Sequence, residues 1–338
     1  MSLSGALAVT FCVSLTVNGW FAWRRHSVWQ DHPGERSLHE TPVPRSGGIA
    51  IWLAVCAGLV GDAPLWMDLF DPCLFLGAFL LFVVAIWDDI RSLTPGVRLF
   101  VQFVSAVLAV AGGGVILQFQ GVAVLWFFIS ILVFLWGINL YNFMDGMDGF
   151  AGGMAVFGFG GLSLLGYWHE DMVFAGICAV IVAANAGFLV FNFPPARLFM
   201  GDSGSTILGF AMVSLGILGY RRDIYPVWVP LILFSPFWVD ASVTLVKRAW
   251  RKEKLWEAHR QHYYQRWVLT GFSHKTVVLA EYLLMAAGLV AVLAWQEGIA
   301  GYNEGGFLAV WALLYGVAIV GSEWFMNGRQ HLLTKRKI

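Results

Sequence analysis

The sequence predicts an all-α, polytopic integral membrane protein that forms a single transmembrane domain over residues 1–338. The chain is 59% hydrophobic and 12% charged, with a mean hydropathy of +0.71, which is too apolar for an ordinary soluble domain. Its apolar residues form long continuous runs and lack the period-two alternation of a transmembrane β-barrel. Membrane-spanning helices are therefore expected.

Eleven apolar runs approach the roughly 20 residues that a helix needs to cross a hydrocarbon core about 30 Å thick. They comprise residues 3–23, 47–65, 72–87, 99–117, 122–140, 150–165, 173–191, 207–220, 227–246, 276–295 and 307–321. Arg24 and Arg25 follow the first run and no basic residue precedes it, which predicts a retained span and not a cleaved signal peptide. We therefore expect about eleven transmembrane helices.

Lysine and arginine are distributed unevenly between the two sides of this predicted bundle. With the N-terminus outside, 19 of the 21 basic residues fall in connections on the inner side or in the C-terminal tail, and only Arg221 and Arg222 do not. Connections rich in these residues face the cytoplasm. The longest polar insertion, residues 247–275, is therefore expected to be a large cytoplasmic loop, and the C-terminus to be cytoplasmic.

Charge and cysteine content exclude several functional classes. The formal net charge is zero and the isoelectric point is about 7.1, so binding to nucleic acid is not expected. The cysteines stand singly inside apolar runs, at Cys12, Cys56, Cys73 and Cys178. They show neither metal-ligand spacing nor a disulfide framework.

Polar motifs stand at the ends of several apolar runs. Asp88 and Asp89 end the third run in WDDI, and NFMDGMDG joins the fifth run to the sixth. NFPPARLFMGDSGS joins the seventh run to the eighth, and AHRQHYYQ lies in the large loop. All four motifs lie on the predicted inner side. Because carboxylates beside hydrocarbon are costly and commonly functional, we expect one active site on the cytoplasmic face.

The carboxylates suggest ligands for a cation or a phosphate. Asn142, Asp145 and Asp148 are spaced by three residues, so on a helix they would form a ridge able to hold a sugar, a metal or a phosphate. Asp88 and Asp89 would point about 100° apart on a helix and could serve different partners, and a cation would relieve their repulsion. Solvated polar helix ends are the structural alternative in both cases.

Two further motifs could bind phosphate groups. In MGDSGS, Asp202 precedes hydroxyl residues at the start of the eighth run, where free backbone N–H groups could cradle a phosphate or the stretch could form an ordinary cap. His259 and His262 flank Arg260 in a pattern suited to gripping a diphosphate, or to a basic loop that touches anionic lipid. The abundant carboxylates favour magnesium over zinc.

Other classes of membrane protein also place acids in apolar runs. An ion-coupled transporter would hold them near the bilayer midplane at broken helices, whereas these acids stand at span ends. An intramembrane aspartyl protease could use an aspartate such as that of MGD, but it would leave the amides and histidines unexplained. The DGxxAR pattern of CDP-alcohol phosphotransferases does not occur in the chain.

The motifs together resemble those of a known family. DDIRSL with RLFVQ, NFMDGMDGFAGG, FNFPPARLFMGDSGSTILG and HRQHYYQ occur in the order typical of polyprenyl-phosphate N-acetylhexosamine-1-phosphate transferases, the glycosyltransferase family 4 type. The resemblance extends over nearly the whole chain. It implies a bacterial inner-membrane enzyme that transfers a sugar 1-phosphate from a UDP-sugar to undecaprenyl phosphate, giving undecaprenyl-diphospho-sugar and UMP. A homodimer in the lipid bilayer is compatible with it.

The resemblance also implies roles for individual residues. Mg²⁺, with Mn²⁺ as a substitute, would be held by Asp202, while Asp88 and Asp89 would be catalytic. The substrate-binding residues would be Arg98, Asn142, Asp145, Asp148, Asn192, His259, Arg260 and His262. Among these, Asn192 would help to read uracil, and Arg98 takes the place of a family lysine, which keeps the charge but changes the geometry.

The large loop bears on the choice of donor sugar. Its HRQHYYQ sequence departs from the HIHH-like cluster of the peptidoglycan translocase and of enterobacterial N-acetylglucosamine enzymes. It resembles the branch that initiates O-antigen with 6-deoxy sugars such as UDP-N-acetylfucosamine or UDP-N-acetylquinovosamine. UDP-N-acetylglucosamine is the alternative donor.

Two mechanisms are open for such a transfer. A phosphate monoester has a second pKa of about 6, so the lipid phosphate is mostly a dianion at neutral pH and can attack the β-phosphorus directly. Asp88 would then orient the acceptor or remove its residual proton. The alternative is a covalent phospho-aspartyl intermediate.

Overall fold

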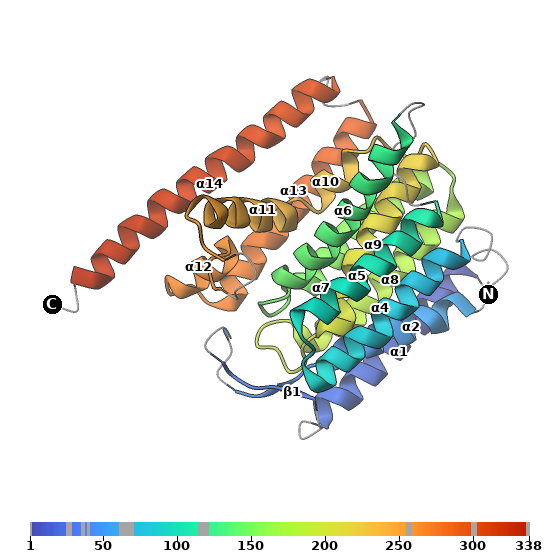
Figure 1. The fold of residues 1–338 in the computed structure, drawn as a ribbon, viewed down its shortest axis with the longest axis horizontal. Helices are drawn as coiled ribbons and strands as arrows, with labels where there is room; N and C mark the ends of the chain where they lie inside the picture. The colour runs from blue at the N-terminus through green and yellow to red at the C-terminus, as the bar shows by residue number, and fades with distance from the viewer. Residues whose placement is uncertain are drawn as a thin grey trace.

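A computed structural model describes residues 2–24, 29–34, 38, 41–60, 71–113, 122–254, 259–298 and 303–335. Over these residues the chain forms a bundle of helices joined by one small antiparallel ribbon (Figure 1). The first helices are α1 (Leu3–Trp23), α2 (Gly47–Val60), α4 (Pro72–Arg91), α5 (Pro95–Ala111), α6 (Ala123–Met144), α7 (Phe150–Trp168) and α8 (Met172–Asn192). The others are α9 (Asp202–Arg221), α10 (Val229–Leu233), α11 (Ser235–Trp250), α12 (Tyr263–Leu269), α13 (His274–Gln296) and α14 (Glu304–Lys335). The ribbon pairs β1 (Gln30–Asp31) with β2 (Val43–Pro44).

The all-α, polytopic membrane architecture is confirmed. Within the described residues, eight helices are long and apolar enough to cross a membrane, namely α1, α4, α6, α7, α8, α9, α13 and the Glu304–Met326 part of α14. The second and fourth runs form the shorter apolar helices α2 and α5. The third and eighth runs become full-length because their helices include the motif acids: α4 continues through Asp88 and Asp89, and α9 begins at Asp202.

The ninth run is not the single span that the sequence predicted. Residues 227–246 are divided into the short α10 and the 16-residue α11, with Phe234 between them. Pro236 stands in the first turn of α11, where its missing N–H and fixed φ favour a new helix start and oppose continuation of α10. Figure 1 shows that α11 consequently runs across the direction of α13.

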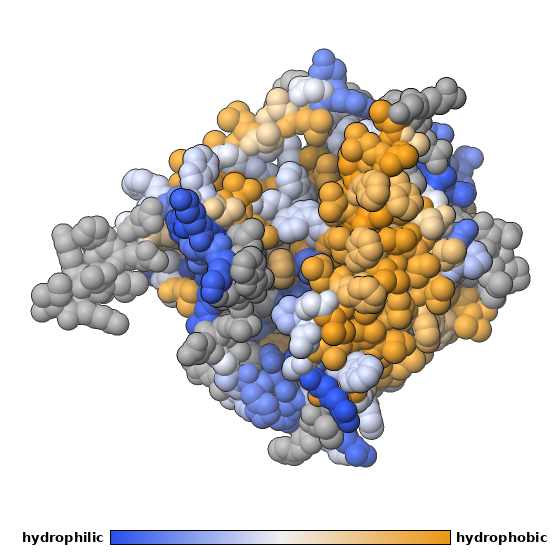
Figure 2. Space-filling model, in the orientation of Figure 1, coloured by the Kyte–Doolittle hydropathy of each residue, from blue (hydrophilic) through white to orange (hydrophobic). Residues whose placement is uncertain are grey.

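The exterior of the bundle is apolar where lipid would contact it. Figure 2 shows a broad hydrophobic face, to which α4, α5 and α6 contribute exposed side chains such as Phe79, Phe100 and Leu132, with fractional exposures of 65%, 66% and 63%. The interior is packed with aromatic rings, among them the fully buried Phe159 and Phe188 of α7 and α8. Apolar residues on both the inside and the outside are typical of a membrane bundle.

The end of the ribbon and the start of α2 hold the start of α9 in place. Phe199 donates its N–H to the Pro44 carbonyl (2.7 Å), and Gly48 donates to the Met200 carbonyl (2.7 Å). A Cβ on Gly48 would lie only 2.2 Å from the Gly204 nitrogen, so the first turns of α2 and α9 touch through their backbones. This contact fixes the position of the first turn of α9, which carries Asp202.

Candidate active site

Two cavities meet at the end of the bundle where α4, α6 and α8 end and α9 begins. The first, which we call the polar pocket, has a volume of about 330 Å³. Its polar lining comprises Asp31, Arg45, Asn142, Asp145, Asp148, Asn192, Asp202, Gln265 and His274. The second, which we call the apolar-walled pocket, has a volume of about 230 Å³. It combines the polar residues Asp88, Arg98, Gln102 and Asn139 with walls of Leu81, Val84, Ala85, Leu99 and Val101. Asn142 and Asp202 line both pockets.

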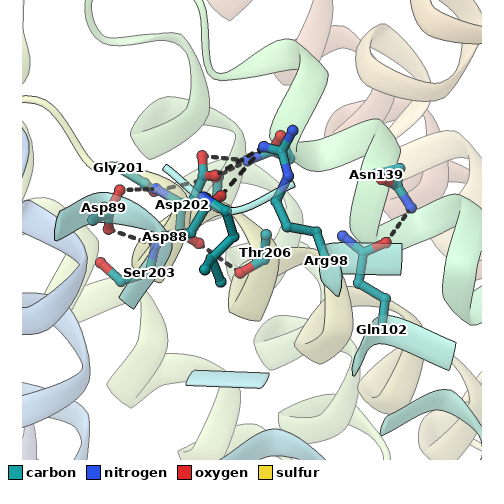
Figure 3. A network of polar contacts seen from close by, with 12 residues as sticks. Asp88, Asp89, Arg98, Gln102, Asn139, Gly201, Asp202, Ser203 and Thr206 are labelled. Carbon is teal, nitrogen blue, oxygen red and sulfur yellow. Dashed lines mark hydrogen bonds and ion pairs between the residues drawn. The ribbon is translucent and has the colours of Figure 1, made fainter. Parts of the chain in front are cut away.

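An arginine joins two carboxylates at the shared boundary (Figure 3). Nη1 of Arg98 lies 3.2 Å from Oδ2 of Asp88 and 3.6 Å from Oδ2 of Asp202. Asp88 is buried, and its other oxygen accepts a hydrogen bond from the backbone N–H of Leu93. The Arg98 side chain is 40% exposed, so its guanidinium keeps donors available for an anion.

Asp89 faces away from Arg98 and caps a helix. Its two oxygens accept hydrogen bonds from the backbone N–H groups of Asp202 (2.9 Å) and Ser203 (3.0 Å), at the positive end of α9. Nη2 of Arg45 donates to the Asp89 carbonyl (2.7 Å). Gly201 adopts φ +75° beside this carboxylate, and a Cβ there would lie 2.9 Å from its oxygens. Of the two alternatives for this helix start, a phosphate cradle or a cap, the structure shows a cap, and Asp89 supplies it.

The three polar residues of NFMDGMDG line the polar pocket without forming a helical ridge, because α6 ends at Met144. Asn142, in the last turn, donates to Asp202 and to Ser205, each at 2.9 Å. Asp145 caps the helix, and Asp148 lies in the following turn, where it accepts from the Ala196 N–H at 3.0 Å. The last turn of α6 and the chain reversal that follows it thus bring all three side chains to one cavity.

Asn192 is buried and bridges two loops of the site. Its Oδ1 accepts from the Gly149 N–H and its Nδ2 donates to the Leu198 carbonyl, both at 2.9 Å. These bonds tie the end of α8 to the loops on either side of the polar pocket. Asn192 lines that pocket, but two of its hydrogen-bonding positions are committed to the protein.

The polar pocket concentrates negative charge. Burial and the neighbouring carboxylates of Asp202, Asp89 and Asp31 raise the pKa of Asp145 well above its usual range. Among the residues that the structure describes, no three His, Cys, Asp or Glu side chains are grouped as a complete metal-binding set. Mg²⁺ commonly takes only one or two carboxylates and completes its shell with water and substrate phosphates. Asp202, whose side chain is 28% exposed at the shared boundary, fits such a ligand.

The HRQH part of the large loop does not reach either pocket lining. His262 is buried with Nδ1 3.2 Å from Oδ1 of Asp240, and Arg260 donates to the Gly34 carbonyl at 3.2 Å. The His259 ring lies 4.8 Å from the His262 ring, and burial together with His262 and Arg248 lowers the pKa of His259 to about 4. A neutral His259 away from the pocket is a poor cationic clasp for a diphosphate.

Four polar residues that were not among the predicted site residues also line the polar pocket. Asp31 and Arg45 come from the ribbon and the segment after it, Gln265 from α12, and His274 from the start of α13. His274 Nδ1 lies 3.3 Å from Oδ1 of Asp148. Gln265 is the last residue of HRQHYYQ. The signal for it was the YYQ ending, which distinguishes this loop from an all-histidine cluster.

Comparison with known proteins identifies the group to which the chain is related. Residues 72–220, from α4 to α9, match the model of glycosyl transferase family 4. A probable undecaprenyl-phosphate N-acetylglucosaminyl 1-phosphate transferase of Bacillus subtilis is 30% identical over 75% of this chain and 74% of the relative. An undecaprenyl-phosphate α-N-acetylglucosaminyl 1-phosphate transferase of Yersinia pestis is 27% identical over 84% of this chain and 80% of the relative.

A third relative matches a similar share of the chain. The decaprenyl-phosphate N-acetylglucosaminephosphotransferase of Mycobacterium leprae is 28% identical over 86% of this chain and 81% of the relative. The matched family segment contains Asp88, Arg98, Asn142 and Asp202, the residues that meet at the boundary of the two pockets. The chain belongs to the polyprenyl-phosphate N-acetylhexosamine-1-phosphate transferase family.

Proposed function

We propose that this protein transfers an N-acetylhexosamine 1-phosphate from a UDP-sugar to undecaprenyl phosphate, giving undecaprenyl-diphospho-sugar and UMP. The observation that carries the proposal is the contact between a polar pocket and an apolar-walled pocket at Asn142 and Asp202. One substrate of such a reaction is a water-soluble nucleotide and the other is a membrane lipid, so a site for both needs these two environments side by side. The names of the relatives support transfer to a polyprenyl phosphate in general.

The two pockets divide the substrates between them. The UDP-sugar would occupy the polar pocket, where amides and carboxylates can meet uracil, ribose and sugar hydroxyls. The acceptor would lie with its first isoprene units against Leu81, Val84 and Leu99 and with its phosphate near Arg98. Arg98 contacts Asp88 and Asp202, so an anion bound there would face both carboxylates.

Asp202 would hold Mg²⁺, or Mn²⁺ in its place, together with phosphate oxygens of the donor. The bound cation would neutralise the diphosphate charge that develops during transfer. Asn142 donates to one Asp202 oxygen and leaves the other toward the boundary, which orients the carboxylate. Asp89 keeps Asp202 at the start of α9 by capping that helix.

The transfer itself requires an attacking oxygen and a leaving group. An oxygen of the acceptor phosphate forms a bond to the β-phosphorus of the donor, and the bond from that phosphorus to the oxygen bridging to the α-phosphorus breaks, with the electron pair leaving on UMP. We propose that Asp88 orients the acceptor phosphate or takes its residual proton, because the dianion is already nucleophilic near neutral pH. Positioning and charge neutralisation by Arg98 then account for much of the rate.

For the donor we propose a UDP-N-acetyl-6-deoxyhexosamine, such as UDP-N-acetylfucosamine or UDP-N-acetylquinovosamine, which would make the protein an initiator of O-antigen or a related polysaccharide. Gln265 supports a distinctive sugar site, since its Oε1 is buried in the polar-pocket lining and has no hydrogen-bond partner among the described residues. UDP-N-acetylglucosamine is the second candidate, favoured by the names of the relatives. Gln265→Ala should change the ratio of kcat/KM between these donors, whereas Gln261→Ala, whose amide binds Glu253 instead, should not.

The site would face the cytoplasm of a bacterial inner membrane, with the N-terminus outside. The uneven distribution of basic residues supports this orientation, because the predicted inner side carries 19 of the 21. A cysteine can be introduced within residues 259–275 of a variant that lacks the native cysteines. In intact cells an impermeant thiol reagent should fail to label it. Labelling without lysis would show that this segment faces outward and would contradict the proposed orientation.

The test of the function is UMP release by purified protein. Mixtures with undecaprenyl phosphate, Mg²⁺ and one donor from a panel of UDP-sugars should release UMP only when all three are present, and fastest with a 6-deoxy donor. Equal or faster use of UDP-N-acetylglucosamine would overturn the donor proposal. No UMP with any donor, from protein that remains folded, would overturn the proposed reaction.

A further inference from the structure

A pair of side-chain amides lies in the apolar-walled pocket, deeper than the charged residues. Gln102 of α5 and Asn139 of α6 both line this pocket, and Gln102 is only 6% exposed. Nδ2 of Asn139 donates to Oε1 of Gln102 and to the Leu135 carbonyl, each at 2.8 Å. Polar groups in an apolar membrane interior are costly and commonly serve a ligand or a helix contact.

The contact with Asn139 orients the Gln102 amide. Because Oε1 of Gln102 faces the Asn139 donor, the Nε2 group must point to the opposite side of the amide. Figure 3 shows that nitrogen on the side facing Arg98. Among the described residues Nε2 has no hydrogen-bond partner, so two N–H donors are available to whatever fills the pocket.

The position of the pair selects the part of a ligand that it would meet. Gln102 follows Arg98 by four residues and Asn139 precedes Asn142 by three, so each amide lies about one helical turn below a residue of the charged boundary. A ligand with its anionic group at Arg98 and its hydrocarbon along Leu81 and Val84 would pass the Gln102 amide just where the two parts join.

We propose that Gln102 binds the acceptor lipid by donating hydrogen bonds from Nε2 to its phosphate group, and that Asn139 is the positioning residue that keeps Nε2 turned toward the pocket. This assignment rests on the proposed function, because it takes a polyprenyl phosphate as the occupant. A neutral donor of this kind binds the phosphate without adding a charge that would lower its nucleophilicity. Arg98 attracts the anion, and the hydrogen bonds from Gln102 orient the phosphate group.

The alternative is that the two amides only fasten α5 to α6. Gln102→Glu separates the possibilities, since a carboxylate still accepts the hydrogen bond from Asn139 but offers no N–H and repels a phosphate. Gln102→Met, similar in shape and uncharged, removes the donor without adding repulsion. Asn139→Leu breaks the contact between the helices and releases the orientation of the Gln102 amide, whose N–H donors are still present.

Binding should be measured with farnesyl phosphate and with farnesol, on purified wild-type and variant protein without UDP-sugar. We expect wild-type protein to bind the phosphate more tightly than the alcohol. Gln102→Met should lose about threefold to tenfold in phosphate affinity and Gln102→Glu about tenfold or more, with farnesol affinity unchanged in both. In turnover assays, KM for undecaprenyl phosphate should rise while KM for the UDP-sugar stays within about twofold.

Two results would overturn the assignment by showing a purely structural contact. One is an equal loss of affinity for farnesyl phosphate and farnesol. The other is a loss of thermal stability in all three variants with no change in the ratio of the two affinities. The binding assay does not depend on turnover. Loss of phosphate preference in the Gln102 variants, from a wild-type protein that releases no UMP, would retain the anion-binding role and refute only the proposed reaction. A wild-type protein that binds farnesol as tightly as farnesyl phosphate would refute the assignment itself.

Discussion

Asp202 and Asp240 are both carboxylates set in largely apolar helices, but the structure surrounds them differently. Asp202 accepts one hydrogen bond from Asn142, lies 3.6 Å from Arg98 and lines two cavities. Asp240 is 8% exposed and accepts hydrogen bonds from Thr244 and from two backbone N–H groups at the start of α12, with His262 beside it.

The difference between these two regions distinguishes a carboxylate that can bind a ligand from one that stabilises the fold. A carboxylate that keeps unused oxygen lone pairs beside a cavity can bind a cation or substrate, whereas one whose lone pairs are filled holds the fold together. Asp240 fixes the first turn of α12, and Gln265 is the third residue of that helix and lines the polar pocket. Asp240 therefore contributes to the site indirectly, by holding the helix that carries Gln265.

The largest effect is expected from Asp202→Asn. If Asp202 holds magnesium at the boundary of the pockets, this change should lower kcat by about a thousandfold or more. The fold should be retained, because the side chain is partly exposed and the amide can still pair with Asn142. Thermal unfolding in detergent and UMP release measure the two effects separately; near-wild-type turnover would remove the assignment.

Asp88→Asn should slow turnover by about a hundredfold to a thousandfold, because a positioned acid or base contributes about that much. If Asp88 only orients or deprotonates the acceptor, the residual rate should recover as pH rises through the second pKa of the lipid phosphate, about 6. A pH–rate profile between pH 5.5 and 8.5 tests this. A flat profile would instead favour a nucleophilic role for Asp88.

Asp240→Asn should give the opposite of the pattern expected for Asp202→Asn, with a larger effect on stability than on kcat. The amide replaces one acceptor oxygen with a donor, so an N–H of α12 would lose its partner and stability should fall by about 1–3 kcal/mol. Once folded, the variant should keep a kcat within about tenfold of wild type. A thousandfold loss of kcat with unchanged stability would place Asp240 among the catalytic groups.

The smallest effect is expected from His259→Gln, with activity within about twofold of wild type because His259 lines neither pocket. Its pKa of about 4 lies below the unfolded value of 6.5, so the unfolded chain binds more protons between those pH values. This contribution to stability is present above pH 6.5 and is lost as pH falls toward 4. The variant should therefore lose less thermal stability than wild type between pH 7 and 5.

A different result at His259 would reinstate the diphosphate clasp that the sequence suggested. In that case His259→Gln would raise KM for the UDP-sugar by about tenfold or more, since a charge-assisted contact would be lost. Steady-state kinetics at neutral pH distinguish the two outcomes.

The sequence was sufficient for the architecture and the family because both depend on local patterns. Apolar runs and span-end motifs predicted a polytopic bundle, and the adjacency of Asp88 and Asp89 on a helix predicted the different partners that they have. The break at Phe234 was missed, although Pro230 and Pro236 inside one run signalled it.

The rest depended on contacts between distant segments. Nothing in the spacing of HRQHYYQ tells which side chains turn toward Asp240 and which toward the polar pocket. Likewise, Arg45 reaches Asp89 only because backbone bonds join the end of the ribbon and the start of α2 to residues 199–200. Hydrophobic patterning fixes which face of a helix is buried, but it does not specify which polar residues meet there.

The most direct test of the central claim, that the acceptor phosphate attacks the donor directly at the boundary formed by Asn142 and Asp202, is UMP formation by enzyme stripped of co-purified undecaprenyl phosphate. Given a UDP-sugar and Mg²⁺ alone, the wild-type protein should release no UMP and carry no added mass; after undecaprenyl phosphate is added, UMP and lipid-linked sugar should appear in equal amounts. A burst of UMP without acceptor, with sugar phosphate retained on Asp88 by mass spectrometry, would contradict direct transfer between the two pockets.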